Sequence, residues 1–445
     1  MDSSLGKKSV AVIGGGFTGL SAAYDLARFG CDVTIFERDA TLGGLAGVFE
    51  LQPGIFLERF YHHWFSSDVA VLDWLKEIGL ESDLISAPTN TGLYFANTIF
   101  KLSSPLDLLR FTPLPFIDRI RTGLMALVAR RVSNFKALES LSAKEWILRY
   151  AGKRSYDVIW APLLKGKFGR YADDVSAVWF WNKLKLRGSS RGKSGAERLF
   201  YVRGGFRRAL QHITKSLDDL RVQIRLNTQV LEVVSEGENL AGKPIGVRLA
   251  NGEVLPFDQV LVTTPAPIAL ELCPQLPSAI ANQMCQIKFL GNICLVLELS
   301  HSLSSTYWLN VADPTFPFVG IIEHTNFDSP TAYGGRHIAF MSKYLPTDEA
   351  LFSSSAEEIL SYTLGHLQKM FPEFSPDWIL ASHVWRESYS QPLVTKNYSQ
   401  LIPPHRLPVH GLWLATMAQI YPEDRGTNYA VAMGRRIAKE MSTAE

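Results

Sequence analysis

Hydrophobic positions near the N-terminus follow two different periods, and the change of period predicts a β-α-β unit. Residues 10–13 form a short continuous apolar run, as expected for a buried parallel strand. Apolar residues recur at helical spacing over residues 20–29, and a second apolar run covers residues 33–36. These segments predict a strand, a helix and a second strand in immediate succession.

The turn between the first strand and the helix carries Gly14, Gly16 and Gly19 in the spacing G-x-G-x-x-G. Gly14 permits a tight turn, Gly16 has no side chain to keep a pyrophosphate off the backbone, and Gly19 lets the helix pack close to the sheet. A lone motif of this kind is weak evidence because glycines also make ordinary turns. With both strands and the helix in place, it predicts a dinucleotide site.

Two further features fit a dinucleotide. The N–H groups at the start of the helix, around Phe17 and Thr18, are expected to face the phosphates. Glu37 ends the second strand, where a carboxylate can accept hydrogen bonds from ribose hydroxyls and its charge argues against a 2′-phosphate.

The residues after Glu37 identify the dinucleotide. Arg38, Gly43, Gly44 and Leu45 belong to the pattern E-R-x-x-x-x-G-G-L-A. It resembles the extended fingerprint of FAD-binding flavoproteins in the amine oxidase superfamily, whose members include protoporphyrinogen oxidase, phytoene desaturase and UDP-galactopyranose mutase. The resemblance implies FAD as the cofactor, with these residues beside it.

The C-terminal part resembles the same superfamily's second FAD motif, a strand at 411–416, a loop at 421–426 and a helix at 427–440. In relatives the start of this helix points at flavin N1 and O2, where a helix N-terminus stabilises negative charge. No cysteine occurs in this segment, so the expected FAD is bound non-covalently. The cofactor contacts implied by the resemblance here are Thr416, Asp424, Gly426, Thr427 and Asn428.

The middle of the chain is expected to return to the cofactor once. Residues 201–206 resemble the family's returning glycine turn, and the resemblance further implies contacts from Val230, Thr264 and Pro265. We therefore predict an α/β fold with a discontinuous Rossmann-like FAD-binding domain and an α+β substrate domain of helices and a mainly antiparallel sheet. The FAD-binding domain is predicted to comprise residues 1–98, 199–270 and 390–445, and the substrate domain residues 99–198 and 271–389.

Four side chains are candidates for the chemistry. His62 and His63 lie in an aromatic segment that leads toward the flavin in relatives, and Tyr429 lies at the start of the C-terminal helix. Lys165 lies in a helical segment that resembles protoporphyrinogen oxidase-like proteins. In that segment Lys167 is a further candidate for contacting the substrate or the flavin region, and an ordinary surface role is the alternative for each lysine. One histidine could remove a substrate proton while a hydride leaves to flavin N5. The alternative is that hydride transfer needs no protein base and the histidines only shape the pocket.

Two basic segments bear on partners. Residues 106–132 have apolar residues interleaved with five arginines, and prolines at 113 and 115 should delay the helix until about Phe116. Such a helix can lie on an anionic membrane, or it can simply cover its own domain. Residues 183–208 hold nine Lys/Arg and one acid, which suggests an anionic substrate or lipid headgroups, although a solvated loop explains it equally well.

Composition narrows the function classes further. The 445 residues are 47% hydrophobic and 20% charged with a net charge of +2, so we expect a globular protein and no nucleic-acid partner. The four cysteines show no metal-site or disulfide spacing, and we see no signal peptide and no apolar run of about 20 residues. A cytoplasmic location, with peripheral membrane contact as an option, is the expectation; the sequence leaves the oligomeric state open.

Three functions remain in competition. The first is an FAD-dependent oxidoreductase that takes a hydride from a C–N or C–C bond of a small molecule, which could be anionic or lipid-linked. The second is a non-redox isomerase similar to UDP-galactopyranose mutase. The third is a non-catalytic prenyl or lipid binder, because Rab GDP-dissociation inhibitors share the fold; the intact FAD motifs argue against it.

Overall fold

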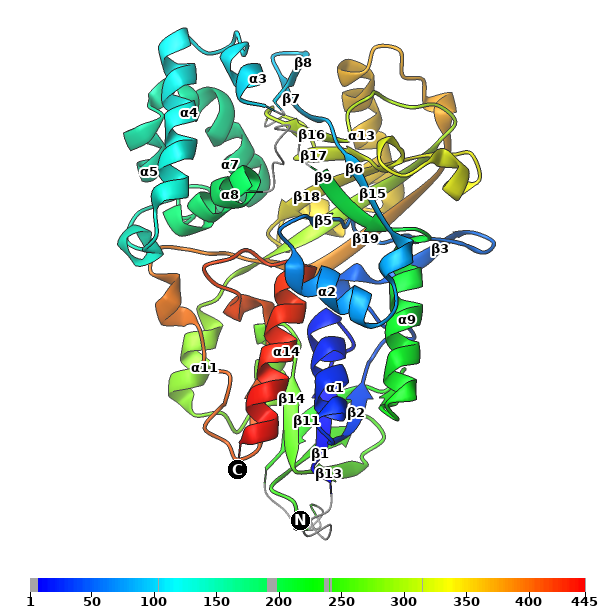
Figure 1. Ribbon diagram of the computed structural model, residues 1–445. Helices are drawn as coiled ribbons and strands as arrows, with labels where there is room; N and C mark the ends of the chain where they lie inside the picture. The colour runs from blue at the N-terminus through cyan, green and yellow to red at the C-terminus, as the bar shows by residue number, and fades with distance from the viewer. Residues whose placement is uncertain are drawn as a thin grey trace.

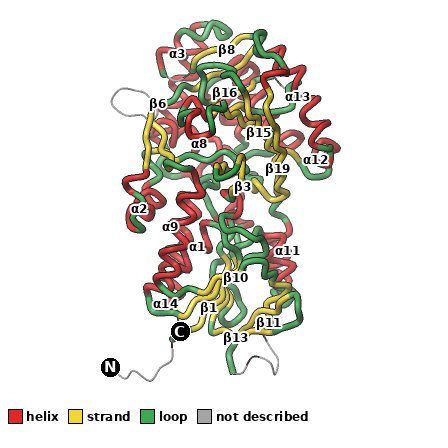
Figure 2. Tube along the Cα trace, turned by 90° about the vertical axis from the view of Figure 1, so that its right-hand side faces the viewer, coloured by secondary structure: helices red, strands yellow, loops and turns green. Residues whose placement is uncertain are grey.

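The computed structural model describes residues 7–102, 104–189, 198–235, 240, 242–313 and 315–444. Figure 1 shows the chain in two lobes: a parallel sheet and its helices lie at the end that holds both termini, and a larger sheet and a helical cluster lie at the other. Figure 2 shows the same arrangement from the side, with β1 and β13 at one end and α3 and β8 at the other.

The parallel sheet has five strands, and both of its faces are covered. Apart from the short edge strand at residues 223–225, its strands are buried almost throughout, which explains why they appear in the sequence as continuous apolar runs. All neighbouring pairs in it are parallel. Its order is β10 (Gln223–Arg225), β2 (Asp32–Phe36), β1 (Ser9–Ile13), β14 (Gln259–Val262) and β20 (Leu412–Leu414).

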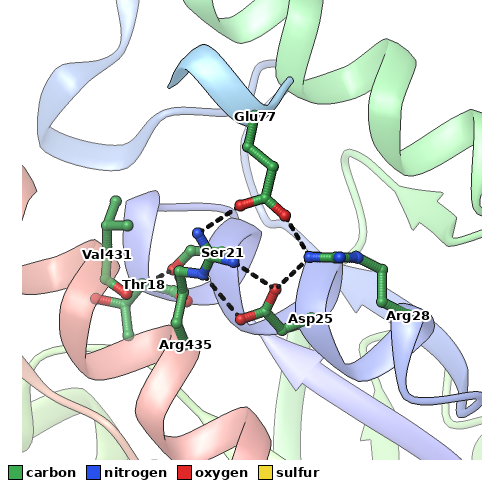
Figure 3. A network of polar contacts seen from close by, with 7 residues as sticks. All are labelled: Thr18, Ser21, Asp25, Arg28, Glu77, Val431 and Arg435. Carbon is green, nitrogen blue, oxygen red and sulfur yellow. Dashed lines mark hydrogen bonds and ion pairs between the residues drawn. The ribbon is translucent and has the colours of Figure 1, made fainter. Parts of the chain in front are cut away.

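The helices on one face of this sheet pack unusually closely. A Cβ atom on Gly434 of α14 would lie 2.3 Å from the carbonyl oxygen of Thr18 in α1, so the two backbones nearly touch there. Arg435 adds a polar link: its guanidinium donates to Asp25 of α1 at 2.9 and 3.1 Å and contacts Glu77 of α2 at 2.8 Å (Figure 3). The helices of this layer are α1 (Phe17–Arg28), α2 (Val69–Glu77), α9 (Gly205–Asp219) and α14 (Thr427–Thr443).

The other face is covered by an antiparallel meander and two short helices. They share one apolar core with the parallel sheet. The predicted boundary at residue 270 is therefore wrong, because α11 packs with the nucleotide-binding lobe and the chain leaves this lobe only after it. The elements are β11 (Val230–Val234), β12 (Ile245–Leu249), β13 (Val254–Phe257), α10 (Ala266–Leu272) and α11 (Ser278–Cys285).

The second lobe contains a seven-stranded sheet that is antiparallel except for the pair β16 and β7. This confirms the mainly antiparallel sheet, but the predicted boundary at residue 98 is wrong, because β7 already belongs to this sheet. Its order is β19 (Ile379–Pro392), β15 (Phe289–Leu299), β18 (His337–Leu345), β17 (Gly320–Glu323), β16 (Trp308–Val311), β7 (Thr91–Phe95) and β8 (Thr98–Lys101).

A helical cluster completes this lobe. As the two prolines predict, α4 begins at Phe116. Residues 190–197 of the basic segment lie outside the described residues, and no helix of the described chain is long and apolar enough to cross a bilayer. The helices of this cluster are α3 (Pro105–Leu109), α4 (Phe116–Arg131), α5 (Ala143–Tyr150), α6 (Lys153–Ser155), α7 (Ala161–Phe168) and α8 (Ala177–Ser189). Two further helices, α12 (Ala350–Ser353) and α13 (Ala356–Met370), pack against the seven-stranded sheet apart from this cluster.

Two small sheets connect the lobes. Both are antiparallel. They consist of β3 (Val48–Gln52) with β4 (Ile55–Glu58), and of β5 (Trp64–Phe65), β9 (Arg198–Val202) and β6 (Leu84–Pro88).

Candidate functional site

The turn between β1 and α1 forms an open cradle. Gly14 has φ +109°, in the region that favours glycine, and a Cβ atom on Gly19 would lie 2.1 Å from the carbonyl oxygen of Gly14. By contrast, a Cβ atom on Gly16 would meet nothing within 4 Å. Gly16 is also the N-cap of α1, and no side chain caps the first N–H groups of the helix, which begin at Phe17 and Thr18.

The second glycine turn lies against the first. The N–H of Gly43 donates to the carbonyl oxygen of Gly15 at 2.8 Å, and a Cβ atom on Gly44 would lie 3.3 Å from Cα of Gly16. The two motifs that the sequence places almost thirty residues apart thus form one continuous backbone surface. Leu45, the next residue, faces the cavity described below.

Glu37 lies at the far end of this cradle. Its carboxylate accepts the N–H groups of Gly15 at 2.7 Å and Asp39 at 2.9 Å, and each oxygen retains a second lone pair for a ribose hydroxyl. The carbonyl of Glu37 accepts from the N–H of Thr228 at 2.9 Å, which brings the start of β11 and buried Val230 close to it. Arg38 is exposed and pairs with Asp39.

The end of β14 closes the cradle on another side. Thr263, which the sequence analysis did not select, donates its hydroxyl to the carbonyl of Ile13 at 2.8 Å. The hydroxyl of Thr264 is buried and has no hydrogen-bond partner among the described residues, and Pro265 is the N-cap of α10. A buried hydroxyl without a partner is costly, so Thr264 is a group that a bound cofactor would satisfy.

The start of α14 provides a second uncapped helix N-terminus. Gly426 is its N-cap and offers no side chain. The side chains of the next two residues form hydrogen bonds within the protein. Thr427 accepts the Trp64 indole N–H at 2.7 Å, and Asn428 accepts the backbone N–H of Val71 at 3.1 Å. Their backbone N–H groups are therefore the part of the motif that can face an anion.

Thr416 is fully buried after β20, and its N–H donates to Gln419 at 2.8 Å. It thus belongs to the packed end of the parallel sheet. The open cradle at Gly16, the acid at the ribose position, the unpaired Thr264 hydroxyl and the uncapped start of α14 together fit FAD.

A cavity of about 390 Å³ lies where the start of α14 meets α7, α8 and the seven-stranded sheet. Most of its wall is apolar or aromatic. Residues that form this wall include Tyr61, Trp160, Leu163, Phe180, Leu184 and Ile322. The cavity is therefore suited to a largely apolar small molecule.

One corner of the cavity is positively charged, and we call Lys167, Lys183 and Arg425 the cationic corner. Lys183 pairs with Asp424 at 2.6 Å, and Arg425 donates to the Tyr344 hydroxyl at 2.7 Å. Burial by itself would raise the pKa of Asp424, but the three cations outweigh burial and hold that pKa below its usual value. Asp424 thus stays ionised and leaves the corner with a positive excess.

Lys167 lies 4.8 Å from the centre of the Trp179 ring and 5.0 Å from that of Tyr344. It lines the cavity, whereas Lys165, the predicted candidate on the same helix, is exposed to solvent and is not a lining residue. Of the two lysines that the sequence offers on α7, Lys167 thus lines the cavity and Lys165 does not, because residues two apart on a helix point in different directions.

Both predicted histidines line the cavity. The Nδ1 of His62 lies 2.7 Å from the carbonyl oxygen of Phe60, so it carries the proton, and burial lowers the pKa of His62 to about 4. His63 lies 3.1 Å from the hydroxyl of Tyr307. With that pKa His62 is neutral at physiological pH but a weak base.

Asp68, which the sequence analysis missed, is a further titratable group of the cavity wall. Burial raises its pKa to about 6, partly offset by the N–H of Phe65 and by Lys183. Tyr429 also lines the cavity, and burial followed by the nearby Asp68, Glu423 and Asp424 carboxylates raises its pKa above its usual value. No sequence motif marked Asp68.

Comparisons with known proteins identify the family and imply the same cofactor, FAD. The family model described as flavin containing amine oxidoreductase matches residues 17–442. The 15-cis-phytoene desaturase of an Oncidium hybrid cultivar is 24% identical over 430 residues, which cover 91% of this chain and 73% of the desaturase. The coproporphyrinogen III oxidase of Bacillus subtilis is 23% identical over 298 residues, covering 61% of this chain and 63% of that enzyme.

Solved structures show the same fold. A protein from Exiguobacterium sp. 255-15 described as a protoporphyrinogen oxidase superposes with a TM-score of 0.76 at 17% identity, covering 99% of both chains. Reduced UDP-galactopyranose mutase superposes with a TM-score of 0.73 at 14% identity, covering 98% of this chain and 94% of the mutase. A putrescine oxidase variant gives a TM-score of 0.70 at 16% identity, covering 98% of both chains.

Proposed function

Because this chain belongs to the flavin-containing amine oxidoreductase family and uses FAD, we propose that it oxidises a largely apolar small molecule with an anionic group. When bound, FAD supplies the acceptor, flavin N5, for a hydride from a C–C or C–N bond of that molecule. Gly16, Glu37, Thr264 and the N–H groups at the start of α14 would hold the cofactor.

The observation that carries this proposal is the pairing of an apolar wall with the cationic corner in one cavity. Trp160, Phe180 and Leu184 exclude water from the apolar part of a substrate. Lys167 and Arg425 would orient a carboxylate or phosphate at one end. The same charges repel an aliphatic ammonium ion, so a polyamine is disfavoured as substrate.

Where the reaction also releases a proton, Asp68 is better placed than His62 to take it. A base is most effective when its pKa lies near the working pH, and burial raises the pKa of Asp68 to about 6 while lowering that of His62 to about 4. His62 would then orient the substrate through Nε2, since its Nδ1 is held by Phe60. His63 shapes the same wall beside Tyr307.

Anaerobic titration of the FAD-loaded protein tests the proposal. The names of relatives supply the probes: phytoene, coproporphyrinogen III, which is an apolar macrocycle with carboxylate groups, and putrescine. We expect coproporphyrinogen III to bleach the flavin absorbance most readily and putrescine to leave it unchanged. Bleaching by putrescine and by neither apolar compound would contradict the proposal.

The same experiment separates oxidation from isomerisation. UDP-galactopyranose converted at catalytic rate by reduced protein, with no change in the flavin spectrum, would replace the oxidase proposal by the mutase alternative. The apolar wall disfavours that outcome, because a nucleotide sugar is polar along its whole length.

A further inference from the structure

A row of large apolar side chains lies exposed on α3 and α4. Phe116 and Ile117 are 64% and 72% exposed, and Leu124 and Leu127 are 54% and 51% exposed. Soluble proteins rarely present so many large apolar residues together without a binding role. We call this surface the α3–α4 face; it consists of Leu106, Leu109, Phe116, Ile117, Ile120, Leu124 and Leu127.

The fold of α4 does not need these side chains. At 3.6 residues per turn, the exposed apolar positions of α4 fall within roughly 100° of its circumference. Thr122, Met125 and Ala129 point the opposite way and are buried against the rest of the helical cluster. The helix thus has one apolar face packed in the protein and a second apolar face exposed to solvent.

Helix α3 extends the same face and is fixed in place. Leu108 lies beside Gly123, where a Cβ atom would be 3.8 Å from its side chain. Arg119 donates hydrogen bonds to the carbonyls of Leu109 and Leu114, both at 2.7 Å, and so ties the end of α3 to α4. The two helices lie side by side at the end of the molecule opposite the termini (Figure 1).

Exposed arginines border this face. Arg110, Arg121, Arg130 and Arg131 are exposed, and within the described part of the chain none of them forms an ion pair. The acids of the two helices, Asp107 of α3 and Asp118 of α4, are both half-buried, and Asp107 caps its own helix through Ser104. The border of the face is therefore positively charged, which complements a negatively charged surface.

We infer that the α3–α4 face docks on an anionic lipid bilayer, with α4 lying along the surface and its apolar side chains among the acyl chains. Apolar residues bordered by unpaired arginines match a phospholipid surface, which presents phosphates above hydrocarbon. Helix α4 has 16 residues, too few to span a bilayer.

The position of the cavity supports a lipid bilayer as the partner that binds the α3–α4 face. Trp160 and Leu163 line the cavity and also join the apolar cluster around Phe111 and Leu114, the residues at the junction of α3 and α4. The wall of an apolar cavity is thus continuous with the base of the proposed docking face. A lipid surface would supply apolar molecules at this position.

Vesicle flotation of the FAD-loaded protein tests the inference. Vesicles of phosphatidylcholine alone are compared with vesicles of equal parts phosphatidylcholine and phosphatidylserine. We expect the wild type to float with the anionic vesicles, and Leu124→Ser/Leu127→Ser to lower that binding at least tenfold. The matched control is Leu231→Ser/Leu380→Ser, two leucines 47% and 50% exposed on strands β11 and β19, which should leave binding unchanged.

A second pair of variants tests the charge. Arg130→Gln/Arg131→Gln should reduce binding to the anionic vesicles and weaken its salt dependence. The control, Lys76→Gln/Lys439→Gln on exposed sites of α2 and α14, should change neither. Flavin content and melting temperature check that every variant is folded.

Three outcomes overturn the inference: a wild type that ignores anionic vesicles, equal losses in the leucine variant and its control, or equal losses in the charge variant and its control. Sedimentation velocity adds a fourth. A wild-type dimer that Leu124→Ser/Leu127→Ser converts to monomer would assign the face to a second copy of the chain.

Discussion

At the scale of single residues, the site depends on where a side chain is absent as much as on where one is present. Gly16 has an extended backbone (φ −78°, ψ 174°) that other residues adopt freely, and a Cβ atom there would meet no protein atom within 4 Å. The need for a glycine at position 16 is therefore explained by the cofactor rather than by the fold.

Gly16→Val should accordingly abolish FAD binding while leaving the protein folded, because the valine side chain would occupy the phosphate cradle. Flavin absorbance of the purified protein and circular dichroism measure the two effects. Gly365→Val on the exposed face of α13, where a Cβ atom is equally unobstructed, is the control and should retain FAD. Normal flavin content in the Gly16 variant would show that the cradle is misassigned.

The two lysines of α7 separate a cavity role from a surface role. Lys167→Met should raise KM for an anionic substrate about tenfold, as expected for the loss of one charge-assisted contact, with a smaller change in kcat. Lys165→Met, two residues away and exposed, should behave like the wild type. Equal kinetics in both variants would remove Lys167 from substrate binding.

Asp68 should make stability depend on pH. Because burial raises its pKa in the folded protein to about 6, protonation stabilises the fold at low pH, and this contribution is lost as pH rises through about 6. Asp68→Asn should thus raise stability at about pH 8, by up to ~3 kcal/mol, and change it little at about pH 4. Thermal unfolding at both pH values measures this.

Asp73→Asn, on the exposed side of α2 just after Asp68, is the matched surface control measured at the same two pH values. The same loss or gain at both pH values in the Asp68 variant would mean that its carboxyl group titrates normally.

At the scale of elements, the cofactor site depends on how closely α1 and α14 approach. Both helices begin at glycines without side-chain caps, at Gly16 and Gly426. Their contact at Gly434 and the link from Arg435 to Asp25 keep them side by side (Figure 3). A small change in the packing of α1 against α14 should therefore alter FAD binding.

Gly434→Ala should destabilise the protein by roughly 1–3 kcal/mol, because the added methyl group overlaps the backbone of Thr18. Some loss of FAD affinity should accompany it. Gly365→Ala on α13 is the matched helical control and should be neutral or stabilise by up to ~1 kcal/mol. Denaturant unfolding and flavin titration give both quantities; a Gly434→Ala variant as stable as the wild type would show that the two helices can separate freely.

At the scale of the whole molecule, the FAD motifs of the two chain ends and the middle return meet in one lobe. The chain's four cysteines are Cys31, Cys273, Cys285 and Cys294, and none of them lines the cavity. A thioether between a cysteine and the flavin therefore has no donor at the cavity.

Denaturation should release all the flavin into the supernatant, because the residues expected to hold the cofactor offer hydrogen bonds and packing contacts and include no cysteine. Absorbance of the supernatant and of the precipitated chain measures the partition. Yellow colour that stays with the precipitate would disprove non-covalent binding.

The sequence by itself determined the FAD-binding half of this protein. Its signals are local: a glycine turn followed by a helix, an acid at a strand end, and an apolar strand that precedes the C-terminal helix. The helix α4 and its start at Phe116 were predictable for the same reason, because prolines act within one turn.

Only the tertiary structure decided the chemistry of the cavity. Asp68, Lys167, Tyr344 and Arg425 are scattered over the chain, and no spacing links them. Whether Lys165 or Lys167 faces inward depends on how α7 packs, and the pKa of Asp68 depends on burial by elements remote in sequence. Local motifs are fixed by neighbouring residues, whereas burial and charge pairing are properties of the assembled chain.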